Sequence, residues 1–222
     1  METPLFQFNP ADRDLVYEPA EDTFLLLDAL EDELAAMKRL RPLVSLEIGC
    51  GSGVVISALA KALGNASGCF LGVDINPHAC RMTRKTAEVN HCDLNVINMD
   101  LLNGFRPGLI DLLVFNPPYV PTCGEPGERL EEQIEQFGAE GYDLVKSWAG
   151  GLDGMVVTNK ILNELDRLLS PVGVFYLLLL RENKPTEIIR RLESEHFKVN
   201  IVKERKIRGE HLFVLKVARN ES

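Results

Sequence analysis

The segment FNPPYV, Phe115 to Val120, places an asparagine and two adjacent prolines directly after the apolar run LIDLLV. Proline donates no backbone hydrogen bond and fixes φ, so Pro117 and Pro118 must end any sheet ladder. The residue before a proline favours extended backbone, which keeps Asn116 out of a helix. The pattern predicts a rigid corner that presents an amide side chain and several carbonyl oxygens as hydrogen-bond acceptors.

Such a corner suits the orientation of a planar nitrogen nucleophile. An amide nitrogen is a poor nucleophile because its lone pair is delocalised into the carbonyl. The Asn116 side-chain oxygen and the Pro117 carbonyl could accept its two N–H groups, and Tyr119 would offer a flat face beside it. The two bonds contribute only about 1–3 kcal/mol together, whereas orientation contributes on the order of 7–11 kcal/mol in ideal cases. The segment holds no strong base, so proton loss would follow or accompany the reaction. The alternative is a Pro-Pro turn in which Asn116 satisfies local backbone.

A glycine loop, LEIGCGSGVV, follows a predicted strand and opens a predicted helix. Gly49, Gly51 and Gly53 would let a ligand approach the backbone, and the helix start offers free N–H groups. A dinucleotide fingerprint requires a small residue at position 54, where this chain has Val54. Glu47 would repel a pyrophosphate and attract an ammonium group. The loop therefore favours a ligand with an amino-acid end and a single nucleoside.

Two further acids follow the next two predicted strands. Asp74 ends CFLGVD, and Asp100 ends the strand after it. Asp74 could accept both hydroxyls of a ribose, and Asp100 is placed for the exocyclic amine of adenine. Each acid alone is explained equally well as a helix or turn cap. Together with Glu47 they describe a crevice at the carboxyl edge of a parallel sheet, where such folds bind ligands.

The elements that must position these residues alternate between helices and strands. Helices are predicted at 24–40, 53–63, 77–90, 158–169 and 185–195, and strands at 43–49, 69–74, 94–99, 109–115, 172–180, 197–205 and 211–217. The alternation predicts one α/β domain over 1–222, a Rossmann-like fold with a seven-stranded, mainly parallel sheet and a C-terminal antiparallel hairpin. Residues 1–42 form an N-terminal extension and helix. The acidic segment 121–147 is either a solvated loop with a short helix around 130–137 or a cover over the FNPPYV corner.

Composition limits the class of function. The 222 residues carry a formal net charge of −9, which argues against holding duplex nucleic acid by phosphate contacts alone. Five cysteines without a CxxC pair, and no signal-peptide pattern, predict a reducing cytoplasm, with the nucleus as an alternative, and no structural zinc. The longest apolar run, VFYLLLL, is too short to span a membrane. The four histidines are scattered, so no metal is assigned.

EIGCGSG, Asp74, Asp100 and the terminal hairpin resemble class I S-adenosylmethionine-dependent methyltransferases. FNPPYV resembles the motif [DNS]-P-P-[YFW] of their amino-methylating members. With YEPAEDTFLLLDAL and WAGG-x-DG, the chain from Val16 to Val217 resembles the short HemK-related branch of eukaryotes and archaea. That branch methylates the glutamine side chain of a Gly-Gly-Gln motif in class-1 translation release factors. The acidic segment before Trp148 is longer than is usual in that branch.

The resemblance implies roles for individual residues. The implied cofactor-binding residues are Thr23, Glu47, Gly49, Gly51, Asp74, Asp100, Leu101 and Asn116, with S-adenosylmethionine as cofactor. The implied catalytic residues are Asn116, Pro117 and Tyr119, and the implied substrate-binding residues are Asn116, Pro117, Pro118, Tyr119 and Val120. Trp148 is either a packing residue or a substrate platform. A small zinc-binding activator protein would form a heterodimer through the apolar edge strand from Leu94 to Met99.

Three alternative functions remain open. An exocyclic amine of adenine or guanine in DNA or RNA presents similar N–H groups, but it requires base flipping and a basic approach surface. A lysine methyltransferase needs a cage for a cation and a route for deprotonation. A non-catalytic nucleoside-binding subunit would have no need of Asn116 beside Glu47, Asp74 and Asp100.

Overall fold

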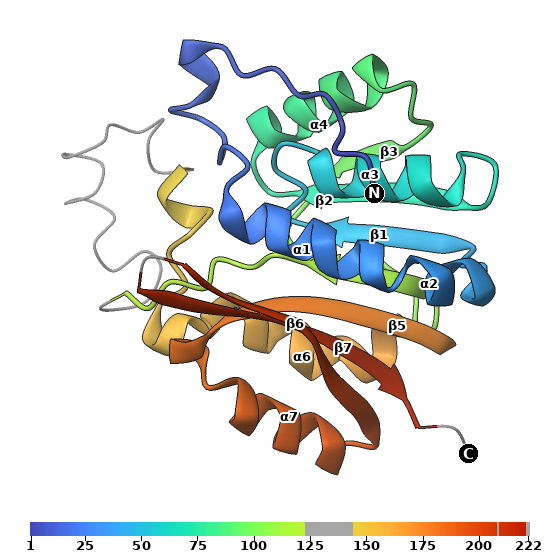
Figure 1. Cartoon of the computed structure of the whole chain (residues 1–222), viewed down its shortest axis with the longest axis vertical. Coiled ribbons are helices and arrows are strands. Elements are labelled where there is room, and N and C mark those ends of the chain that lie inside the picture. Colours follow the sequence, from blue (N-terminus) through green and yellow to red (C-terminus); the bar gives the residue numbers. More distant parts are fainter. Residues whose placement is uncertain (123–143, 208, 221–222) are drawn as a thin grey trace.

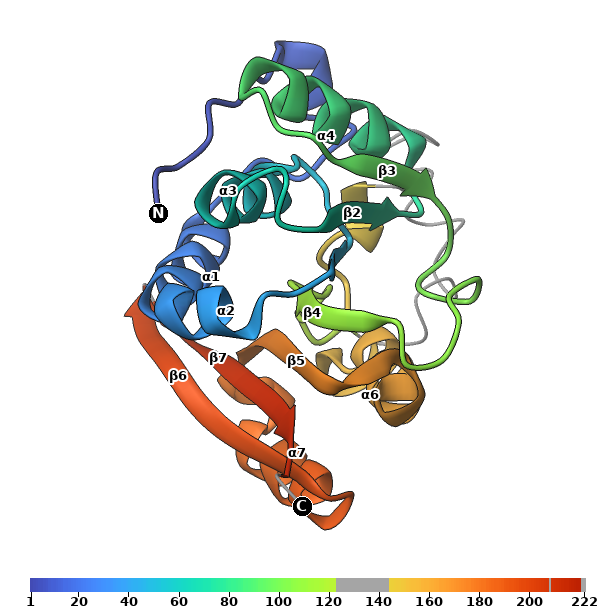
Figure 2. The same ribbon diagram turned by 90° about the vertical axis from the view of Figure 1, so that its right-hand side faces the viewer.

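The computed structural model describes residues 1–122, 144–207 and 209–220. These residues form a seven-stranded sheet in the order β3-β2-β1-β4-β5-β7-β6, with helices on both faces (Figures 1 and 2). The strands are β1 (Val44–Ile48), β2 (Cys69–Asp74), β3 (Asn95–Asn98), β4 (Ile110–Phe115), β5 (Leu169–Leu180), β6 (Phe197–Ile207) and β7 (Glu210–Arg219). The helices are α1 (Glu21–Asp32), α2 (Leu34–Leu40), α3 (Val54–Leu63), α4 (Pro77–Val89), α6 (Val156–Leu168) and α7 (Pro185–Ser194), and short 3-10 turns lie at Pro10–Asp12, Leu152–Gly154 and Arg181–Asn183.

The pairing of the strands confirms the predicted fold class. Strands β1 to β5 pair in parallel, whereas β7 is antiparallel to both β5 and β6. β3 lies at one edge, as predicted for the segment from Leu94 to Met99, and β6 lies at the other. β2 and β4 lie on opposite sides of β1, so the order in which strands are added to the sheet reverses at β1. Such a switch point opens a crevice at the carboxyl ends of the strands.

Strand β4 is buried on both faces. Leu112 and Val114 pack in the cluster formed with α1, α2 and α3, whereas Leu113 and Phe115 pack in the cluster formed with α6 and α7. Figure 2 shows these two groups of helices on opposite sides of the sheet. Burial on both faces explains why LIDLLV reads as a nearly continuous apolar run. The strand therefore carries the FNPPYV corner on a rigid support.

The prediction of one helix over 24–40 was wrong, because α1 and α2 are separate helices with Glu33 between them. Glu33 has φ −88° and ψ −1°. Its Oε2 accepts hydrogen bonds from the Tyr176 hydroxyl (3.2 Å) and from the Lys216 ammonium group. Both partners lie on distant strands, so the local apolar period gave no sign of the break.

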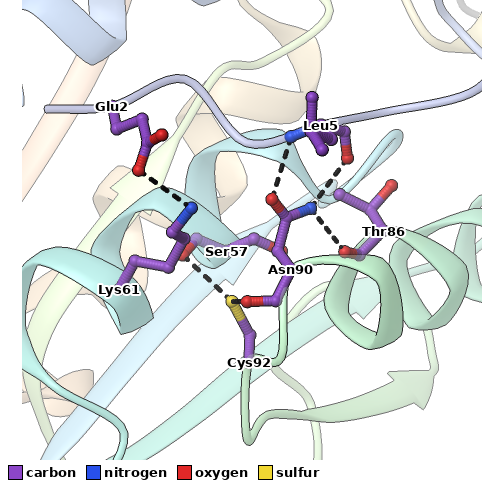
Figure 3. A network of polar contacts seen from close by, with 7 residues as sticks. All are labelled: Glu2, Leu5, Ser57, Lys61, Thr86, Asn90 and Cys92. Carbon is purple, nitrogen blue, oxygen red and sulfur yellow. Dashed lines mark hydrogen bonds and ion pairs between the residues drawn. The ribbon is translucent and has the colours of Figure 1, made fainter.

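The N-terminal segment lies against α3 and α4 and is fixed there by side chains (Figure 3). Asn90 accepts the Leu5 N–H (2.9 Å) and donates to the Leu5 carbonyl (2.7 Å) and to the Thr86 carbonyl (2.7 Å). Asn76 donates in the same way to the Leu15 carbonyl (2.7 Å). The side-chain amides of these asparagines thus form hydrogen bonds with backbone groups that a neighbouring strand would otherwise satisfy.

The acidic segment 121–147 lies largely outside the described residues, and the helix predicted around 130–137 lies there entirely. Its role as a loop or a cover therefore stays a prediction, as does the single-domain boundary 1–222. Within the described ranges, no helix combines the length and apolarity needed to cross a membrane.

Candidate active site

A cavity of about 350 Å³ lies at the carboxyl ends of β1, β2 and β4, and its volume suits a small-molecule ligand. The residues predicted to bind a cofactor all line it: Thr23, Glu47, Gly49, Gly51, Asp74, Asp100, Leu101 and Asn116. Pro117, Pro118, Tyr119 and Trp148 line it as well. The fold thus brings the glycine loop, the three acids and the FNPPYV corner to one site.

The glycine loop connects β1 to α3 with left-handed backbone. Gly53, at the N-terminus of α3, has φ 78°, and a Cβ atom there would lie 2.6 Å from the Thr83 Cα atom of α4. Only glycine meets both requirements without a shift of α4. The close approach of α3 to α4 therefore requires a small residue at position 53. Position 54 has no such requirement, and Val54 is buried there as the first residue of α3.

The side chain of Glu47 is buried, and only 3% of the residue is exposed to solvent. Its Oε2 accepts the Ile56 N–H of α3 at 2.9 Å. Burial raises the pKa of Glu47 well above its ordinary value, and the charge of Asp74 adds to this shift, while the bond from Ile56 opposes it. A cation in the cavity would offset this desolvation, and that Glu47 faces an ammonium group stays a prediction.

Asp74 ties the glycine loop to the end of β2. One carboxylate oxygen accepts the Gly51 N–H (2.9 Å) and the other accepts the Asn76 N–H (2.9 Å). These bonds fix the carboxylate orientation at the cavity wall, and each oxygen has two lone pairs. Asp100 lies beyond β3 at the same cavity, followed by Leu101 with φ 48°.

Asp22, in the first turn of α1, binds the FNPPYV corner. Its Oδ2 accepts the Asn116 Nδ2–H (3.0 Å) and the Tyr119 hydroxyl (3.2 Å). Its Oδ1 accepts the Tyr17 hydroxyl (3.2 Å) and the Thr23 N–H (2.7 Å). The carboxylate is buried, with 3% of the residue exposed, so these donors replace water.

This arrangement fixes the orientation of the Asn116 amide at the cavity wall. An ionised carboxylate only accepts hydrogen bonds, so the NH₂ group of Asn116 must point to Asp22. The Oδ1 atom is left buried without a hydrogen-bond partner. A buried acceptor without a partner is costly, and a bound N–H donor would satisfy it. Burial, followed by the Asp22 charge, raises the pKa of Tyr119, so its hydroxyl remains a donor to Asp22.

The sequence analysis assigned no role to Asp22 or Tyr17. Both belong to YEPAEDTFLLLDAL, a segment quoted for its resemblance alone. Val120, predicted to bind substrate, is absent from the cavity lining, and its backbone pairs with Trp148 and Gly150. Trp148 lines the cavity with 37% of its surface exposed.

The described part of the chain holds no group of three or more His, Cys, Asp or Glu residues placed to bind a metal ion. Carboxylates, backbone groups and the oriented Asn116 amide line the cavity. These groups can hold a nucleoside with a cationic end beside an N–H-bearing nucleophile.

Comparisons with known proteins show which chains this one is similar to. A chain of the E. cuniculi Mtq2–Trm112 complex, which methylates the translation termination factor eRF1, superposes with a TM-score of 0.67 at 29% identity and covers 93% of this chain and 99% of that chain. The eRF1 methyltransferase catalytic subunit mtq2 of Schizosaccharomyces pombe is 40% identical over 216 residues, 92% of this chain and 89% of the relative. Methyltransferase HEMK2 of Homo sapiens is 38% identical over 208 residues, 92% of this chain and 90% of the relative.

The sheet order, the antiparallel hairpin and the crevice at the switch point define a class I methyltransferase fold. The family model "Methyltransferase small domain" matches residues 21–136, over half of the chain. This chain belongs to that family.

The bond between Asp22 and Asn116 leads to a first prediction. Asp22→Asn has the same shape but offers an NH₂ group to Asn116 and Tyr119, so the Asn116 amide loses its fixed orientation. We expect the rate of methyl transfer at saturating methyl donor to fall on the order of tenfold to a hundredfold. Asp166→Asn, the same change at an exposed position of α6, is the control and should keep the wild-type rate. Equal rates in the two variants would contradict the role given to Asp22.

The buried Glu47 leads to a prediction on stability. Because its folded pKa is raised, the ionised carboxylate destabilises the folded state above that pKa, and the penalty disappears as the pH falls toward the ordinary value of about 4.3. Glu47→Gln should therefore raise the melting temperature of the ligand-free protein near neutral pH and raise it less near pH 4. Scanning calorimetry of this variant beside Glu193→Gln, at an exposed site on α7, measures the effect. A gain independent of pH would rule out the desolvated carboxylate as its cause.

Proposed function

We propose that this chain transfers a methyl group from S-adenosylmethionine to the side-chain amide nitrogen of the glutamine in the Gly-Gly-Gln motif of a class-1 translation release factor. The observation that carries the proposal is the buried Asn116 Oδ1 atom, which has no hydrogen-bond partner and belongs to a residue that lines the cavity. The relatives named as eRF1 methyltransferases, which align over nine tenths of the chain, support the choice of substrate.

The residues around the cavity fit S-adenosylmethionine. Glu47 offers a buried negative charge for the ammonium group, and Thr23 lies beside Asp22 at the same wall. Asp74 would hold the ribose hydroxyls, and Asp100 with Leu101 would hold the adenine. When bound, this cofactor supplies a methyl group on a positively charged sulfur, which is a strong electrophile.

The FNPPYV corner would orient the glutamine amide for attack on that methyl group. Asn116 Oδ1 would accept one amide N–H, and the Pro117 carbonyl would accept the other. Tyr119, held by its hydroxyl on Asp22, would lie beside the planar amide. The amide nitrogen would take up the methyl group that the bound cofactor supplies and would release one proton to solvent, because the FNPPYV segment holds no strong base. The chain contributes position, because two neutral bonds alone account for only about 1–3 kcal/mol.

We further propose a heterodimer with a small zinc-binding activator subunit, and the E. cuniculi Mtq2–Trm112 complex, in which a similar chain has a protein partner, supports the assembly. β3 is a short edge strand that pairs with β2 alone among the described strands, and Ile97 on it and Ile75 beside it are exposed at 38% and 54%. An exposed apolar edge is suited to pairing with another chain. We propose a cytoplasmic location, with the nucleus as an alternative, because release factors act on cytoplasmic ribosomes.

The activity test uses the chain co-expressed with its activator and methyl-labelled S-adenosylmethionine. Purified release factor, its Gln→Ala variant in the Gly-Gly-Gln motif, DNA, RNA and a histone mixture are offered in separate reactions. Label is expected on the wild-type release factor alone. Asn116→Ala should remove the label, whereas Asn163→Ala, at an exposed asparagine of α6, should keep it. Label on nucleic acid or on lysine would replace the proposed substrate and leave the fold and cofactor site unchanged.

The edge-strand proposal predicts a separable effect on assembly. Ile97→Asp places a charge on β3, and it should abolish co-purification of the activator. Ile201→Asp, at a 47% exposed position on β6 at the opposite edge of the sheet, is the matched control and should retain the activator. Retention by both variants would place the activator elsewhere on the surface.

A further inference from the structure

The segment WAGGLDG, Trp148 to Gly154, forms a ladder with the residues that follow the FNPPYV corner. The Val120 N–H donates to the Trp148 carbonyl (3.0 Å), and the Gly150 N–H donates back to the Val120 carbonyl (2.8 Å). The Thr122 N–H extends this pairing to the Gly151 carbonyl (3.0 Å). The corner therefore continues, as far as Thr122, into a short pairing built on one parallel bridge between Val120 and Ala149.

Asn183 joins this ladder to the corner from the end of β5. Its Nδ2 donates to the Tyr119 carbonyl (2.8 Å) and to the Asp153 carbonyl (2.8 Å), and its Oδ1 accepts the Leu180 N–H (2.7 Å). The residue is 2% exposed, so all of these bonds are formed away from water. Three separate chain segments thus meet at one side chain.

The backbone of Gly154 packs tightly against the Tyr119 carbonyl group that Asn183 binds. Gly154 has φ 69°, and a Cβ atom there would lie 2.0 Å from the Tyr119 carbonyl oxygen. That oxygen is therefore confined between the Gly154 backbone and the Asn183 amide. Tyr119 is held at both ends, because its hydroxyl binds Asp22 and its carbonyl binds Asn183.

We propose that Asn183 is a positioning residue for the methyl-transfer reaction, which it serves by fixing the Tyr119 backbone and with it the angle of the acceptor corner. The inference rests on the proposed function. Asn183 itself does not line the cavity, whereas Tyr119 and Trp148 do. It should therefore affect the orientation of the substrate amide and leave the affinity for the cofactor intact.

The expected result is a separation of kcat from cofactor binding. Asn183→Ala removes both donors, and Asn183→Asp keeps the acceptor for Leu180 but turns carboxylate oxygens toward two carbonyls. In the activator complex, each variant should lower kcat by about tenfold or more, with the Kd for S-adenosylmethionine within about twofold of wild type. The aspartate variant provides the test if the alanine variant fails to fold.

Asn90→Ala is the matched control (Figure 3). Asn90 is a buried asparagine that also makes three hydrogen bonds to backbone, to Leu5 and Thr86, on a distant part of the fold. It should lose a similar amount of thermal stability and keep the wild-type kcat. A purely structural role for Asn183 predicts instead that the two variants behave alike.

A second readout is independent of the substrate. Trp148 is the only tryptophan, and its carbonyl belongs to the ladder that Asn183 secures. Its emission maximum and acrylamide quenching should change in both Asn183 variants and stay unchanged in Asn90→Ala. If the wild-type complex failed to methylate a release factor, the proposed function would fall, and this fluorescence comparison would still decide whether Asn183 fixes the corner. Wild-type fluorescence together with wild-type kcat in Asn183→Asp would overturn the proposal.

Discussion

The hydrogen bond from the Asn116 amide to the buried Asp22 carboxylate is the interaction on which the site depends. A carboxylate accepts and does not donate, so it binds the NH₂ end of the amide and leaves the Oδ1 atom without a partner. The Asn116 Oδ1 atom is buried and has no hydrogen-bond partner. This state costs free energy when the site is empty, and an N–H donor on a bound substrate would remove that cost. The site thus discriminates by hydrogen-bond polarity, and a reacting group that presents only acceptors would meet repulsion there.

Two distant segments must be held in register for this bond to form, because Asp22 and Asn116 are 94 residues apart in the sequence. Asn116 stands at the end of β4, which is buried on both faces. Asp22 stands in the first turn of α1, whose exposed side is joined to β6 by ion pairs from Arg205 to Asp28 and from Lys203 to Asp32. The C-terminal hairpin therefore supports the helix that carries the carboxylate, although neither of its strands supplies a residue to the cavity lining.

Much of the fold follows from local patterns in the sequence. The apolar runs and the glycine loop predict the parallel sheet, and the strand-end acids Asp74 and Asp100 predict the crevice, because parallel strands end at a common edge. The roles of Asp22, Glu33 and Asn183 could not be predicted in this way. Each is an ordinary helix-end or turn residue in the sequence and acquires its role from partners on distant elements. Tertiary hydrogen bonds leave no periodic signal, so a structure is needed to find them.

The most direct measurement is the binding of two peptides to the activator complex loaded with the reaction product S-adenosylhomocysteine. One peptide carries the Gly-Gly-Gln motif and the other carries Gly-Gly-Glu, which replaces the amide donors by acceptors of the same shape. Isothermal titration should show the glutamine peptide binding at least about tenfold more tightly, because Asn116 Oδ1 requires a donor. Equal affinity for the two peptides would contradict the claim that Asp22 and Asn116 select an N–H-bearing nucleophile.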